Sequence, residues 1–218
     1  MKIILLLSLY LFIQVSSFQV LGIDLSAWDD TVYWDTLKNE VKFVILRAGI
    51  GQNGGDAVYE QYYKKCKEIG MPVGAYWYSK ATTVKAAQQE AYYFLEKLKG
   101  KQFEYPVYFD VEYGAIFDTG KENVSNMVKA FCSIMEQNKY YCGLYSSKYY
   151  LETYFTEEVL NAYDIWLAHY TSSTSYKRHL MWQYTDTGRL NGKPGDCDLN
   201  YCYYDYPTLI KSRHFNGF

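Results

Sequence analysis

The chain has 218 residues, a formal net charge of −2 and 26 tyrosines. This length is enough for one large α/β core and short for two domains of ordinary size. The near-neutral charge, without any run of Lys and Arg, argues against a nucleic-acid-binding protein.

The first 17 residues have the pattern of a secretory signal peptide. Lys2 precedes an apolar run that ends near Ile13, and small polar residues follow at Ser16 and Ser17. The run is shorter than the roughly 20 residues of a membrane span, so cleavage is favoured over anchoring. We therefore predict a signal peptide at residues 1–17 and a mature domain at 18–218. This domain would be secreted or delivered to a lysosome- or phagosome-like granule, with no membrane contact after cleavage.

Strands and helices are predicted to alternate through the first part of the chain and helices to become rare later. The predicted strands are 18–24, 43–48, 72–79, the apolar start of 105–113, 141–146, 164–170, 179–184 and 197–200. The predicted helices are 33–39, 57–69, 83–99, 122–138 and 156–162. Eight strands with helices reduced in the C-terminal half favour the α/β class and a single irregular TIM-like (β/α) barrel.

The stretch 105–113 has the pattern most typical of catalysis. It begins as an apolar strand and ends with Asp110 and Glu112, separated by one Val. Because side chains alternate along a strand, both carboxyls point to the same face. Two acids on partly apolar surroundings do not both ionise easily, so one pKa rises and that group becomes a proton donor. We interpret Glu112 as this acid, although a solvated strand end or a salt-bridge partner has the same pattern.

Other polar residues occur at the C-terminal ends of predicted strands, where barrels of this type carry their chemistry. Asp24, Tyr78, Tyr145 and Asp198 all stand at such ends. With Asp110 and Glu112, they would bring four carboxyls to one mouth of the barrel. Such a cluster is typical of an active-site pocket.

At these motifs the chain resembles glycoside hydrolase family 25, the Chalaropsis-type lysozymes, over nearly all of the predicted mature domain. The motifs that carry the resemblance are Gly22–Ser26, Phe43–Ala48, Gly74–Tyr78, Tyr108–Glu112, Trp182–Tyr184 and Asp196–Asn200. Each is weak alone, but their order and spacing together are specific.

The resemblance implies a monomeric muramidase that needs no cofactor. Its substrate would be the β-1,4 bond between N-acetylmuramic acid and N-acetylglucosamine in bacterial peptidoglycan. Glu112 would be the general acid, and an ionised Asp110 would stabilise the acetamido or oxocarbenium centre. Asp24 and Asp198 would complete the acidic floor, Asp24 as a catalytic and Asp198 as a supporting residue. Implied substrate contacts are Tyr78, Tyr145, Trp182 and Gln183. Substrate assistance is favoured over a direct attack by water, and both stay open.

Three alternatives compete with this interpretation. A chitinase-like hydrolase also carries Asp-x-Glu at its fourth strand, but expects another Asp two positions earlier, where this chain has Tyr108. An inactive carbohydrate-binding protein fits the aromatic content, but Glu112 argues for activity. A metal-dependent hydrolase is disfavoured because His169, His179 and His214 form no ligand-spaced set, so no metal is predicted.

The five cysteines suit an oxidising compartment, and their odd number leaves at least one outside any intrachain pairing. Cys197 with Cys202 is the favoured disulfide and Cys132 with Cys142 the next, with the connectivity open. Asn123 begins an Asn-Val-Ser acceptor site for N-glycosylation.

Overall fold

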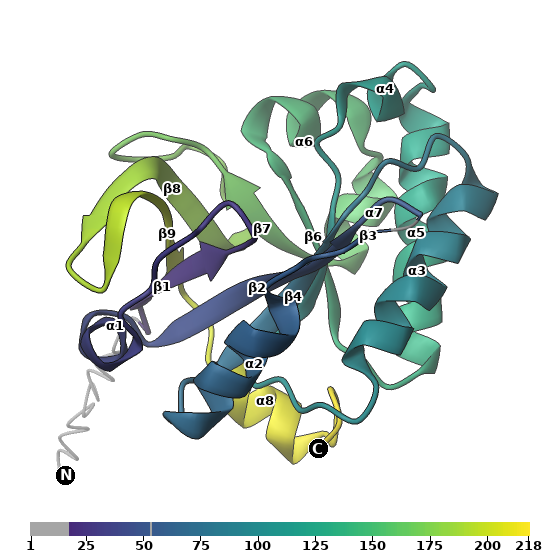
Figure 1. Cartoon of the computed structure of the whole chain (residues 1–218). Coiled ribbons are helices and arrows are strands. Elements are labelled where there is room, and N and C mark those ends of the chain that lie inside the picture. The colour runs from purple at the N-terminus through teal and green to yellow at the C-terminus, as the bar shows by residue number, and fades with distance from the viewer. Residues whose placement is uncertain (1–17, 53) are drawn as a thin grey trace, which may run out of the picture.

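A closed ring of eight strands forms the centre of the computed structural model (Figure 1), which describes residues 18–52 and 54–218. The predicted signal peptide, residues 1–17, lies outside the described residues. The ring strands are β1 (Val20–Leu25), β2 (Phe43–Ile50), β4 (Val73–Tyr78), β5 (Val107–Asp110), β6 (Cys142–Ser147), β7 (Asp164–Ala168), β8 (His179–Leu190) and β9 (Lys193–Cys202). The remaining strand, β3 (Gly54–Gly55), pairs with the end of β2.

Parallel pairing runs from β1 through β2, β4, β5, β6 and β7 to β8. Strand β9 then lies antiparallel between β8 and β1 and closes the ring. This confirms the predicted α/β barrel. The β8–β9 hairpin is longer than predicted because its outer part, around the turn at Asn191 and Gly192, lacks the apolar alternation by which a strand is recognised.

Most of the helices lie outside the parallel half of the ring, whereas α8 (Tyr206–Ser212) lies below the strands in Figure 1 and packs Tyr206 and Ile210 on the interior residues Tyr108 and Trp166. The other helices are α1 (Trp34–Glu40), α2 (Tyr59–Glu68), α3 (Val84–Leu98), α4 (Gly114–Phe117), α5 (Lys121–Gln137), α6 (Lys148–Tyr154) and α7 (Glu157–Ala162). Five of them match the predicted helices, whereas α4, α6 and α8 were missed. Within the described residues, none of the helices has the length and apolar character needed to cross a bilayer.

Alternation along β5 orients the catalytic candidates. Tyr108 belongs to an aromatic cluster with Trp166 and Tyr145, whereas its neighbour Phe109 stacks on Phe131 of α5. Tyr108 therefore points into the ring and Phe109 toward the helices. Asp110, one residue later, points into the ring again, at the end of the strand.

The predicted disulfide between Cys197 and Cys202 is wrong. Both residues lie on β9, five positions apart, so their Cα atoms are about 17 Å apart. A disulfide needs Cα atoms within about 4.4–6.8 Å. The second predicted pair is also unbonded: Cys132 of α5 and Cys142 of β6 are free thiols whose sulfurs lie 3.1 Å apart. Within the described residues, which include all five cysteines, each cysteine is a buried free thiol.

Asn123, the predicted glycosylation residue, lies in the first turn of α5. Its Nδ2 atom donates a hydrogen bond to the Thr82 carbonyl oxygen at 3.2 Å. A glycan would replace one of the two hydrogens on that nitrogen and leave the other for Thr82. Glycosylation stays a prediction.

Candidate active site

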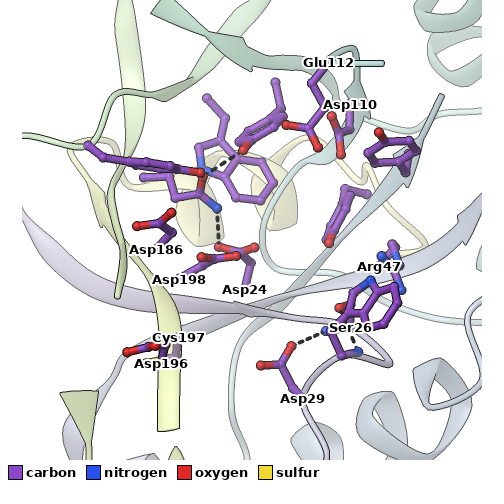
Figure 2. A pocket seen from close by; sticks show the side chains of 17 residues that line it. Asp24, Ser26, Asp29, Arg47, Asp110, Glu112, Asp186, Asp196, Cys197 and Asp198 are labelled. Carbon is purple, nitrogen blue, oxygen red and sulfur yellow. Dashed lines mark hydrogen bonds between the residues drawn. The ribbon is translucent and has the colours of Figure 1, made fainter. Parts of the chain in front are cut away.

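The C-terminal ends of the ring strands surround a cavity of about 370 Å³, which we call the active-site cavity. It is lined by seven of the eight predicted site residues: Asp24, Tyr78, Asp110, Glu112, Tyr145, Gln183 and Asp198. Figure 2 shows the Asp110 and Glu112 carboxyls near each other, and Asp24 beside Asp198. The structure therefore brings the four predicted carboxyls to one mouth. Asp24 and Asp110 stand at the ends of parallel strands as predicted, whereas Asp198 lies within the antiparallel strand β9 and not at its C-terminal end. The roles of the four carboxyls stay predictions.

Asp110 is the deepest acid of the cavity. It is the last residue of β5, its side chain is 2% exposed, and its Oδ1 atom has no hydrogen-bond partner among the described residues. Burial raises its pKa well above the ordinary value, and the charges of Glu112 and Asp24 raise it further, against the opposing effect of Arg47. A buried acceptor without a partner is costly, so this oxygen is suited to accept a donor from a ligand.

Glu112 stands nearer to solvent, two residues past Asp110. Burial raises the pKa of its carboxyl, and the charge of Asp198 adds to the rise. Burial is therefore the main cause of the raised pKa of both carboxyls. An ionised Asp110 beside a neutral Glu112, the arrangement expected from the sequence, stays a prediction.

Asp24 and Asp198 form the opposite wall. They are directly opposed residues of the antiparallel strands β1 and β9. Burial raises the pKa of Asp24, and the charge of Asp198 raises it further. Burial, followed by Asp29 and Asp186, raises the pKa of Asp198 to about 6. The pair therefore carries a proton at mildly acidic pH.

Gln183 of β8 holds Asp24 in place. Its Nε2 donates to Asp24 Oδ2 at 3.0 Å, and its Oε1 accepts from the hydroxyls of Tyr145 at 2.7 Å and Tyr170 at 3.0 Å. Asn200 Nδ2 donates to the same Asp24 oxygen at 2.7 Å. Gln183 and Tyr145 are therefore already hydrogen-bonded within the wall, and contact with a substrate stays a prediction for both. Tyr78 is partly exposed beside Glu112 and is better placed to touch a ligand.

The structure gives no support to the predicted contact of Trp182 with the substrate, which stays untested. Trp182 does not line the active-site cavity, and it is only 6% exposed. Its Nε1 donates to the His169 carbonyl oxygen at 2.8 Å, and its ring packs edge-on against His179 and Tyr184. Because neighbouring residues of a strand face opposite sides, the inward position of Gln183 turns Trp182 outward.

Two exposed aromatic residues of the cavity were not among the predicted site residues. Trp28, on the loop after β1, is 84% exposed at the mouth, and Tyr170 follows β7. Exposed aromatic rings offer flat apolar faces on which sugars can stack. Trp28 could have been found from its sequence position, because it follows Asp24 by four residues, on a loop past a strand end.

Two cations near the cavity are paired with acids. Arg47 Nε pairs with Asp56 Oδ2 at 2.7 Å, and Lys193 Nζ with Asp29 Oδ1 at 3.2 Å. Asp56 also accepts the backbone N–H of Ala27, which ties the loop after β1 to β2. The cavity consequently keeps an acidic character.

The buried acids predict that folding stability falls as pH rises. A carboxyl with a raised folded pKa binds more protons in the folded than in the unfolded state between the two pKa values, so its stabilising contribution is lost as pH increases. For Asp198, with a pKa of about 6, the expected loss between pH 5 and 8 is about 1 kcal/mol. Urea unfolding at several pH values measures this loss. Asp198→Asn should flatten the profile, and an unchanged profile in that variant would contradict the assignment.

Comparison with known proteins gives consistent matches. The model of the family "Glycosyl hydrolases family 25" matches residues 23–193. The chain is 24% identical over 198 residues to the uncharacterized protein YegX of Escherichia coli strain K12, covering 85% of this chain and 70% of YegX. It is 27% identical over 186 residues to the autolytic lysozyme of Clostridium acetobutylicum, covering 82% of this chain and 54% of that protein. The structure of the spore cortex lytic enzyme SleM of Clostridium perfringens superposes with a TM-score of 0.76 at 25% identity, covering 84% of this chain and 67% of SleM.

Proposed function

The chain belongs to glycosyl hydrolase family 25 and is a glycoside hydrolase of the lysozyme type, and from this we propose that it is a muramidase of bacterial peptidoglycan. The bond cleaved is the β-1,4 linkage between N-acetylmuramic acid and N-acetylglucosamine. The observation that carries the proposal is the pair of carboxyls at the end of β5, one deep and without a partner, the other nearer to solvent.

Glu112 is the general acid in this proposal. Its raised pKa favours the protonated carboxyl, which supplies a proton to the glycosidic oxygen. As the bond to the anomeric carbon breaks, the leaving sugar keeps the oxygen and takes this proton. The Glu112 carboxylate later accepts a proton from the water that completes hydrolysis.

Asp110 acts on the acetamido group of the sugar that is attacked. Its unpartnered Oδ1 accepts the acetamido N–H, which turns the acetamido oxygen toward the anomeric carbon. That oxygen forms a bond to the carbon as the glycosidic bond breaks, and the positive charge that develops is stabilised by Asp110 in its ionised form. The positive charge lowers the pKa of Asp110, against the effect of burial, and so favours the ionised carboxylate.

Reducing-end analysis tests the proposed bond specificity. Purified peptidoglycan is incubated with the protein, the new reducing ends are labelled by borohydride, and the sugars are identified. Labelled muramic acid is the expected product. Labelled glucosamine would indicate a glucosaminidase, and the absence of new ends would indicate an inactive binding protein.

A chitinase-like activity is the second candidate, and Tyr108 argues against it. A third carboxyl at that position would help to orient Asp110, but Tyr108 is fully buried in the aromatic core of the ring. We expect slower cleavage of chitin oligosaccharides than of peptidoglycan strands. The reverse order would favour the chitinase-like assignment.

We also propose that the protein is secreted or stored in an acidic granule, based on the signal-peptide pattern of residues 1–17. The raised pKa values of the cavity acids suit such a compartment. N-terminal sequencing of the mature protein, recovered from medium and from granules, tests both the cleavage and the location.

A further inference from the structure

A second hollow, of about 390 Å³, adjoins the active-site cavity at the barrel mouth; we call it the side hollow. It lies between the ends of β6 and β7, where Lys148, Tyr149 and His169 line it. Glu112 and Tyr170 line both spaces, whereas Asp110 lines only the active-site cavity. The two spaces therefore meet at the proposed general acid.

If the proposed function holds, this arrangement sets the direction in which the glycan strand runs across the site. The sugar whose acetamido group meets Asp110 occupies the active-site cavity. The glycosidic oxygen that Glu112 protonates joins this sugar to the leaving part of the strand. Because Glu112 stands where the two spaces meet, the leaving part continues into the side hollow.

The two spaces differ in charge. The active-site cavity is lined by Asp24, Asp29, Asp186, Asp196 and Asp198 in addition to the catalytic pair. Among the described residues, the side hollow is lined by the ammonium of Lys148 and by a single acid, Glu112. Burial and then Lys148 lower the pKa of His169, which favours its neutral form. An anionic group on the substrate is thus favoured in the side hollow and disfavoured in the acidic cavity.

Lys148 retains N–H donors that can bind a ligand. Its Nζ donates to Ser175 Oγ at 2.9 Å and lies 3.9 Å from Glu152 Oε1, with the side chain 25% exposed. An ammonium has three N–H donors, so at least one remains for an incoming carboxylate. Tyr149, which is 63% exposed, presents its ring beside Lys148 as a surface on which a sugar can stack.

We infer that the side hollow binds the leaving side of the glycan strand and recognises a carboxylate there through Lys148, with Tyr149 as the stacking surface. In an alternating strand cut after muramic acid, the next muramic acid is the second sugar past the bond. Its carboxylate belongs either to a bare lactyl group or to the peptide stem attached to it. Both sources share the same chemistry, and the choice between them is made by experiment.

The test compares Lys148→Gln and Lys148→Arg with the wild type on glycan fragments that extend two sugars past the cleaved bond. The fragments carry bare lactyl groups or peptide stems, each also in a form whose carboxylates are converted to neutral methylamides. Lys129→Gln is the matched control, because Lys129 also bonds one partner, Glu158 at 3.0 Å, and lines neither space.

We expect Lys148→Gln to raise KM about fivefold on at least one of the two carboxylated fragments, the size of one partly exposed ion pair, with little change in kcat. The effect should disappear on the neutralised fragments, and Lys148→Arg and Lys129→Gln should behave like the wild type. An effect confined to bare fragments assigns the lactyl carboxylate, and one confined to stem-bearing fragments assigns the peptide.

Two results would overturn the inference: an unchanged KM in Lys148→Gln, or an equal rise on charged and neutralised fragments. A thermal melt of each variant identifies any loss of folding, and restored binding in Lys148→Arg separates the charge from the shape of the side chain. Failure of the wild type to cut any fragment would refute the muramidase proposal itself, whereas an active wild type with an indifferent Lys148 would refute only the role of the side hollow.

Discussion

Replacing Glu112 with Gln is expected to lower kcat on peptidoglycan by at least about 100-fold, because the substitution removes the proton that the leaving oxygen must receive. Positioned general acids contribute roughly 10²–10⁴ to the rate. Folding should be preserved, since the side chain keeps its shape and its carboxyl makes no hydrogen bond within the described residues. Release of reducing ends under substrate saturation measures the effect.

The control for this variant is Glu96→Gln, which changes an exposed acid of α3 outside the active-site cavity and should leave kcat unchanged. The pH profile gives a second readout. Wild-type activity should fall as pH rises through the raised pKa of Glu112, because the protonated form is required. The residual activity of Glu112→Gln should not show this fall. Turnover by Glu112→Gln at the wild-type rate would contradict the role of this residue.

The strand ends could be predicted because their pattern is local. An apolar run followed by Asp110 and Glu112 gives both the strand and its polar end, and the alternation of side chains places both acids on one face. Asp24, near the end of β1, reaches the same mouth because β1 and β5 run parallel within the ring. Asp198 reaches it for another reason, because it lies within the antiparallel strand β9, directly opposite Asp24. The placement of Asp110, Glu112 and Asp24 therefore needed no knowledge of distant contacts, whereas that of Asp198 depends on the pairing of β9 with β1.

The same local reasoning does not predict which way Trp182 points. A barrel strand is buried on both faces, so its sequence is apolar throughout and the inward face cannot be told from the outward one. In β8 it is Gln183 that points inward, fixed by its bonds to Asp24 and Tyr145, which join residues far apart in the chain. The motif therefore identified the correct strand and named two of its side chains, of which Gln183 lines the cavity and Trp182 does not.

The short helices were missed and the disulfides wrongly predicted for related reasons. Helix α4 has four residues and α6 has seven, too few for an apolar periodicity to be recognised. Cys132 and Cys142 lie close together only because α5 packs on β6. Neither the sequence spacing of the cysteines nor their number predicts whether two of them have the geometry of a disulfide. Trp28 lies on a loop, where no periodicity exists to orient it.

Replacing Asp110 with Asn is expected to lower kcat by about 100-fold or more, the usual cost of removing one preorganised electrostatic partner of a transition state. The amide has nearly the shape of the carboxyl, so the fold should persist, and stability at neutral pH should rise because a buried acid with a raised pKa is removed. Steady-state kinetics and thermal melts measure the two effects. A variant that turns over as fast as the wild type would exclude Asp110 from the reaction.

The assignment of Asp110 to the acetamido group is tested by combining this variant with N-deacetylated strands. If the acetamido oxygen attacks the anomeric carbon while Asp110 holds its N–H, removing either partner abolishes the same interaction. Deacetylation should then slow the wild type strongly and Asp110→Asn little further, as in a double-mutant cycle of coupled groups. The product should form with retained anomeric configuration by NMR, because attack by the acetamido oxygen and then by water inverts the carbon twice. Additive losses together with an inverted product would instead indicate direct attack by water, with Asp110 acting on that water.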